Sequence, residues 1–194
     1  MKAVELLLRE HQDVEAILAI LEAVARRVDD DRPVPPSLLT DLLEVCEHGV
    51  ERAHVAKEEC VLFPALAARG LDQKMTVVAA LTSQHEAVRA FLGEMRRAAD
   101  AIAGGDASAW RAFLLASRDY VKVVREHLRI EDEYFYSLAD RTLDPADDGA
   151  LLAGFERIDR VVVPPHQRAR CQALLQRCRD VVAGWATEVE GGTS

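Results

Sequence analysis

Two segments of the sequence carry a histidine followed four residues later by a glutamate. These pairs are His54 with Glu58 and His127 with Glu131. Residues four apart differ by about 40° around an α-helix, so each pair projects from one side of its helix, one turn apart. Imidazoles and carboxylates that face an apolar interior cost free energy unless a partner satisfies them. Metal ions are such partners, so the pairs indicate metal-binding chemistry.

An internal repeat doubles this pattern. Residues 7–18 align with residues 81–92 at a shift of 74, and residues 54–66 align with residues 127–139 at a shift of 73. A single His-x-x-x-Glu is typical of a surface ion pair, but two in register, each joined by a repeated histidine, favour a metal centre. The predicted ligands are His11, His54, Glu58, His85, His127 and Glu131.

This set of side chains suits a pair of metal ions. The carboxylates would bridge the ions and the histidines would terminate them, as inward-projecting Glu and His do in di-iron bundles. Mixed imidazole and carboxylate ligation favours iron, with manganese and zinc as alternatives. Because the set supplies fewer than six ligands to each ion, positions stay open for water, oxygen, nitric oxide or peroxide.

Helical segments must position these residues. Apolar side chains recur at three- and four-residue spacing through most of residues 1–140, and proline-rich or glycine breaks divide this stretch into four. The expected helices are 4–28, 37–69 capped by Ser37 and ended by Gly70, 72–104 capped by Asp72, and one from Asp106 or Ser108 to about 140. Long helices with short links predict an all-α fold, an antiparallel up-and-down four-helix bundle.

The rest of the chain, residues 141–194, is expected to form a C-terminal helical extension packed on the same domain as the bundle of residues 1–140. The amphipathic pattern of residues 171–185 predicts packing against the bundle or a second chain, so a homodimer through the extension stays open. Three valines at 161–163 could form a strand fragment, but without a partner strand a packed linker is favoured.

The composition excludes several partners. Lys plus Arg is 24 against 33 Asp plus Glu, a net charge of −9, with no basic block. We therefore expect no binding to nucleic acid and no docking to an anionic membrane. The chain lacks a long uncharged apolar run and a signal-peptide pattern, and its four cysteines show no C-x-x-C spacing. The expected location is the cytoplasm.

The ordered spacing of four histidines and two glutamates, with Leu62-Phe63-Pro64 after the first pair, resembles the hemerythrin-like (HHE cation-binding) domain over about residues 5–140. The resemblance implies a non-haem di-iron centre in a four-helix bundle. Oxygen-carrying hemerythrins have a second histidine where this chain has Arg89. Their last helix supplies His-x-x-x-x-Asp, a spacing that His127 and Asp132 also satisfy. Glu131 is favoured as the bridge because the repeat pairs it with Glu58, and Asp132 remains the competing ligand.

Other side chains near the predicted ligands could act on the centre. Glu15 and Arg89 occupy equivalent repeat positions one turn after His11 and His85, and we expect them to pair near the open metal positions. Glu59 is expected to be a solvated partner of Lys57 or Arg52. The run Tyr134, Phe135 and Tyr136 most simply packs the bundle end, although a tyrosine there could hydrogen-bond a bound oxygen species. His48 and His166 are expected to lie off the metal site.

Three functions share this ligand set. One is a sensor or binding protein for oxygen, nitric oxide or peroxide, in stress response or in repair of iron centres, since the motif order also resembles bacterial di-iron repair proteins. Another is an enzyme that reduces peroxide or nitric oxide, or oxidises ferrous iron. The third is an iron store or donor.

Overall fold

The computed structural model describes residues 1–71 and 76–190, and these residues form helices without a β-strand. Their order along the chain is α1 (Lys2–Asp29), α2 (Pro36–Val45), η1 (Cys46–Val55), η2 (Glu58–Leu62), α3 (Phe63–Ala68), α4 (Thr76–Ala103), α5 (Ala109–Ile130), η3 (Glu131–Phe135), α6 (Tyr136–Thr142), α7 (Pro145–Val161) and α8 (Pro165–Glu190). The predicted all-α fold is therefore confirmed. No helix in this described part is long and apolar enough to cross a membrane.

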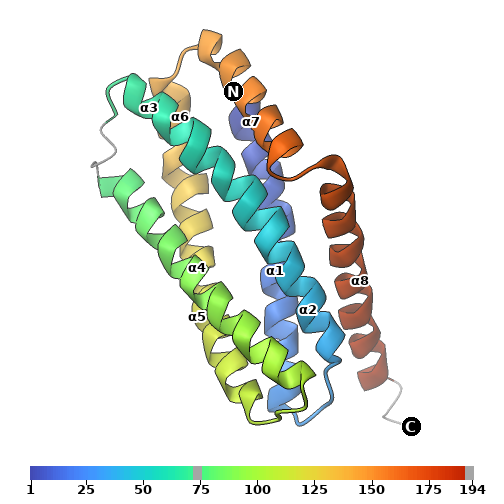
Figure 1. Cartoon of the computed structure of the whole chain (residues 1–194). Coiled ribbons are helices and arrows are strands. Elements are labelled where there is room, and N and C mark those ends of the chain that lie inside the picture. Colours follow the sequence, from blue (N-terminus) through green and yellow to red (C-terminus); the bar gives the residue numbers. More distant parts are fainter. Residues whose placement is uncertain (72–75, 191–194) are drawn as a thin grey trace.

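Four long helical runs lie antiparallel in a bundle (Figure 1). α4 and α5 pack along one another, α5 also packs on α1, and α2 packs on α4. Gly70 and Gly105 end helical runs with positive φ values of 90° and 95°, which glycine adopts without strain. The second run begins at Pro36 rather than after a Ser37 cap, because proline suits the first helical turn, where its missing N–H is not needed. The predicted cap Asp72 lies outside the described residues.

Three elements are short π-helical segments inside these runs. η1 contains His54, η2 begins at Glu58, and η3 begins at Glu131. A π turn holds more residues than an α turn, so it rotates the side chains that follow it, and such turns are frequent at functional sites. The prediction of uninterrupted α-helices is wrong at these points, because apolar spacing does not reveal a local change of helical pitch.

The apolar core is divided into two clusters with a polar layer between them. On α1, Leu7 belongs to one cluster and Val14 to the other, and on α4, Leu81 and Val88 divide in the same way. A buried histidine lies between the two members of each pair. The predicted ligands thus occupy a layer that apolar side chains close from both ends of the bundle.

The two helices after the bundle lie against its first half. α7 packs on α1 and η2, and α8 packs on α2, η1 and α1 (Figure 1). The apolar face of α8 adds Leu174, Leu175 and Cys178 to a core cluster. The apolar face of α8 therefore packs on the chain's own bundle.

The valine run lies at the join of α7 and α8. Val161 is the last residue of α7 and is 68% exposed, whereas Val163 is 1% exposed. The expected packed linker is thus correct for Val163 and wrong for Val161, because α7 extends further than predicted.

Candidate metal centre

The structure brings all six predicted ligands together in the polar layer. Each is at most 5% exposed, and α1, η1, η2, α4, α5 and η3 supply them. They form two overlapping groups in which one ligand atom per residue lies within 4.8 Å of the others. The groups are Glu58, His85, His127 and Glu131, and His11, His54 and Glu131.

Glu131 faces both groups. Its Oε1 atom lies 3.1 Å from His127 Nε2, and its Oε2 atom lies 3.3 Å from His11 Nε2. Glu58 has a similar place, because its Oε2 atom lies 3.4 Å from His85 Nε2 and 3.9 Å from His54 Nε2. Two carboxylates thus lie between two pairs of imidazoles, a donor set that would hold cations.

The outer nitrogen of every ring is held by a side-chain oxygen. His11 Nδ1 lies 2.8 Å from Asp132, and His85 Nδ1 lies 2.9 Å from Glu59. The other two pairs are His54 Nδ1 with Glu10 Oε2 at 3.1 Å and His127 Nδ1 with Gln84 Oε1 at 3.1 Å. With oxygen acceptors there, each Nδ1–H is able to donate, and a ring that does so would direct its Nε2 lone pair into the layer, as in the outer hydrogen bonds of metal-binding histidines.

Several polar atoms of the layer are buried without a hydrogen-bond partner. They are His54 Nε2, Glu58 Oε2 and both carboxylate oxygens of Glu131. Leaving such atoms unpaired in an apolar interior costs about 1–3 kcal/mol each. A cation coordinated by them removes that cost, so the donor set fits a metal.

The charges of the layer support one another. Burial would lower the pKa of His11 and of His85, but the carboxylates beside them, chiefly Glu131 for His11 and Glu58 for His85, outweigh it and raise both pKa values. Burial would likewise raise the pKa of Glu131, whereas the imidazoles of His127 and His11 beside it hold the pKa below its usual range. Glu131 is therefore an ionised carboxylate, the form that binds cations.

Tyr136 adds a hydroxyl to the centre. It is 2% exposed, its O–H donates to Glu58 Oε1 over 2.7 Å, and its oxygen lies 3.2 Å from His11 Nε2. Burial and the nearby carboxylates raise its pKa well above the usual value, so the phenol keeps its proton. Tyr134 is 52% exposed. Of these two candidates, the structure brings only Tyr136 to the centre.

The surroundings of Arg89 differ from the prediction. Arg89 donates to Glu59 Oε2 over 2.6 Å and also pairs with Glu51, while Glu15 is exposed on α1. The expected Glu15–Arg89 pair is therefore replaced by an Arg89–Glu59 pair that leads to His85. Glu59 is partly exposed, as expected, but its predicted partners are wrong, because it bonds Arg89 and His85 rather than Lys57 or Arg52.

Two outer partners, Glu10 and Gln84, were not predicted from the sequence, and Asp132 was predicted only as a competitor for the ligand position. The geometry puts Asp132 on the outer nitrogen of His11 and Glu131 inside the layer. A signal was present, because all four outer partners directly precede or follow a predicted ligand in the sequence. They also repeat, since Glu10 aligns with Gln84 and Glu59 with Asp132 at the shifts of 74 and 73 residues.

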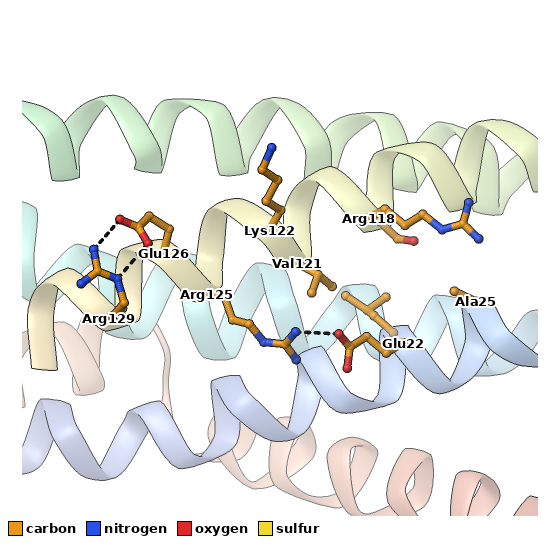
Figure 2. Close-up of a pocket in the computed structure, with 10 residues that line it drawn as sticks. Glu22, Ala25, Arg118, Val121, Lys122, Arg125, Glu126 and Arg129 are labelled. Carbon is orange, nitrogen blue, oxygen red and sulfur yellow. Dashed lines mark hydrogen bonds and ion pairs between the residues drawn. The ribbon is translucent and has the colours of Figure 1, made fainter.

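A groove of about 840 Å³ lies between α1 and α5 (Figure 2). Arg118, Lys122, Arg125 and Arg129 line it, and Arg125 donates to Glu22 across it over 2.7 Å. None of its lining residues belongs to either ligand group. The groove is therefore not the candidate metal centre.

Comparison with known families agrees with this geometry. The family model for the hemerythrin HHE cation binding domain matches residues 2–139, and a second match covers residues 76–190. The chain belongs to the hemerythrin HHE cation-binding domain family. The second match starts with α4, where the second copy of the internal repeat begins. Searches of curated proteins and of solved structures found no match.

Proposed function

We propose that this centre holds two iron ions and binds a small ligand, namely oxygen, nitric oxide or peroxide. One observation carries the proposal: Glu131 directs one oxygen toward His127 and the other toward His11, and neither oxygen has a hydrogen-bond partner. A bridging carboxylate between two ions accounts for both oxygens. Iron is favoured over manganese and zinc because the ligands combine imidazoles with carboxylates.

The chain's own residues prepare the site for a polar ligand. Iron would supply redox chemistry and open coordination positions. The outer hydrogen bonds hold the four rings, and the two apolar clusters keep bulk water from the layer. Tyr136 retains a proton beside Glu58 and His11 and is able to donate it in a hydrogen bond to a ligand oxygen or nitrogen. These features support a role in sensing, stress response or iron-centre repair.

Metal analysis tests the proposal. Mass spectrometry on protein purified without an affinity tag should find about two irons per chain, with visible charge-transfer bands that vanish on reduction. His54→Ala should lose metal, whereas the matched control His166→Ala, at an exposed position of α8, should not. Absence of iron after anaerobic reconstitution would contradict the proposal, and uptake of manganese or zinc alone would correct the metal.

A second experiment separates the binding role from its alternatives. Nitric oxide or peroxide is added to the iron-loaded protein with a reductant present. Reversible spectral change without loss of reductant supports a sensor or carrier. Sustained reductant consumption identifies an enzyme, and transfer of iron to a weak chelator identifies a store or donor.

A further inference from the structure

Lys57 is completely buried, with 0% of its surface exposed, directly before η2. Its ammonium group pairs with Glu10 on α1 and lies 3.0 Å from Asp159 Oδ1 on α7. A buried ammonium needs such compensation, because its desolvation costs several kcal/mol. α7 therefore supplies one of the two carboxylates that surround the Lys57 ammonium group inside the protein.

These contacts extend in both directions. Glu10 Oε2 accepts from His54 Nδ1 over 3.1 Å, and Asp159 also pairs with Arg168 at the start of α8. A continuous path of charged contacts thus runs from a candidate metal ligand through Lys57 to both helices of the extension.

The second half of the bundle has no equivalent of this path. At the repeat shifts, Glu10 aligns with Gln84 and Lys57 aligns with Ile130, so a neutral amide and an aliphatic side chain replace the ion pair. Gln84 still accepts from its histidine, His127. Holding the outer nitrogen of a ring therefore does not require a charged pair, and the pair occurs in the half that the extension covers.

A small cavity lies in the same place. It has a volume of about 150 Å³ and lies between α1, η1 and α8, and Glu10, His54, Arg168 and Cys171 are among the residues that line it. The extension thus contacts the His54 side of the centre in two ways, through the ion pairs of Asp159 and through the residues of α8 that line this cavity.

We propose that Lys57 is a positioning residue through which α7 and α8 set the metal affinity of the His11–His54 side of the centre. The inference rests on the proposed metal function. Lys57 and Asp159 orient Glu10 so that it accepts from His54, and this hydrogen bond fixes the ring for coordination. Moving the extension away would weaken one ion's binding without removing any ligand.

Anaerobic titration of the metal-free protein with ferrous iron tests this inference, with cobalt(II) absorbance as a second probe. Lys57→Met should weaken one of the two binding steps by about 10–100-fold and leave the other nearly unchanged. Asp159→Asn should act in the same direction with a smaller effect. The matched control is Asp148→Asn, since Asp148 also ties α7 to α1, through the backbone N–H groups of Lys2 and Ala3, but does not contact Lys57.

A double-mutant cycle separates positioning from a general structural effect. In a His54→Ala background, Lys57→Met should cause no further loss of affinity, while in a His127→Ala background its effect should persist. Equal weakening of both steps, or an undiminished effect without His54, would overturn the inference. Failure of the unmodified chain to bind ferrous iron would instead overturn the metal function itself.

The repeat provides a variant for the case in which Lys57→Met does not fold. Glu10→Gln combined with Lys57→Ile copies the pair that the second half already uses, so we expect it to fold. The ferrous iron affinities of its two binding steps should differ less than those of the unmodified chain. Mutation of Asp159 should no longer change either affinity. An Asp159→Asn effect that survives in this background would contradict the role of Lys57.

Discussion

The two halves of the centre use the same ligands in different surroundings. His54 is held by Glu10, which pairs with buried Lys57, whereas His127 is held by the neutral Gln84. The aromatic neighbours differ too, because Tyr136 aligns with Phe63 in the repeat. A repeat thus sets the coordination pattern, while single residues around it make the two sides chemically unequal.

Removing the carboxylate that both halves share should have the largest effect. Glu131 belongs to both ligand groups, so Glu131→Ala should weaken the binding of both ions. The loss of affinity should exceed the 10–100-fold that is typical of mutations at outer partners. His85→Ala removes a residue of one group and should affect mainly one ion. Metal per chain after passage over a chelating resin measures both, and two retained ions in Glu131→Ala would show that another residue bridges.

Displacing α7 from the bundle should make the surroundings of the two sides of the centre more alike, because α7 supplies Asp159 to one side only. A Cβ atom at Gly154 would lie 2.6 Å from Val61 Cγ1, and valine side chains have little rotamer freedom in a helix. Gly154→Ala should therefore destabilise the protein by about 1–3 kcal/mol, despite the helix propensity that alanine gains. Urea unfolding measures this change. Val61→Ala in the same chain should restore most of the loss, and no restoration would place the strain elsewhere.

The centre was largely predictable because helix geometry fixes the spacing of its ligands. Two His–Glu pairs with a spacing of four, related by 73 residues, and two single histidines related by 74 residues already define the six positions that the structure brings together. The outer contacts were less accessible, since they join different helices. Arg89 and Glu59, for example, meet only because α4 and η2 are neighbours and each helix is rotated about its axis so that these two side chains face one another. The π turns help to set that rotation.

The extension shows the same limit. The helices of the extension follow from amphipathic spacing. The burial of Lys57 beneath Asp159 depends on how α7 docks on the bundle, and the local sequence pattern of neither segment predicts this docking. The internal repeat did contain a signal, because Lys57 aligns with Ile130. A charged residue aligned with an aliphatic one indicates that the two halves have different neighbours at that position.

The hydroxyl of Tyr136 should have a moderate effect on ligand binding. Tyr136→Phe gives the His11 side the phenyl ring that Phe63 already presents to His85, with ring centroids 6.2 Å apart on that side. Loss of one hydrogen bond of about 1 kcal/mol should weaken nitric oxide binding to the ferrous protein about fivefold, with metal content unchanged. Phe63→Leu is the control on the other side. Unchanged nitric oxide affinity in Tyr136→Phe would mean that the hydroxyl serves Glu58 alone.

The smallest expected effect is on stability, from the exposed ion pairs between α8 and the first half of the bundle. A hydrogen bond from Arg170 lowers the pKa of Glu44 from 4.5 to about 2, so this stabilisation is complete above pH 4.5 and is lost as the pH falls toward 2. Arg170→Met should lower the free energy of unfolding only slightly near neutral pH, and by less in high salt. Urea unfolding of metal-free protein should show the difference shrinking between pH 4.5 and 2. Arg118→Met, which removes the α5–α1 pair with Asp29, is the matched control, and only the α8 variant should also raise protease sensitivity within the extension.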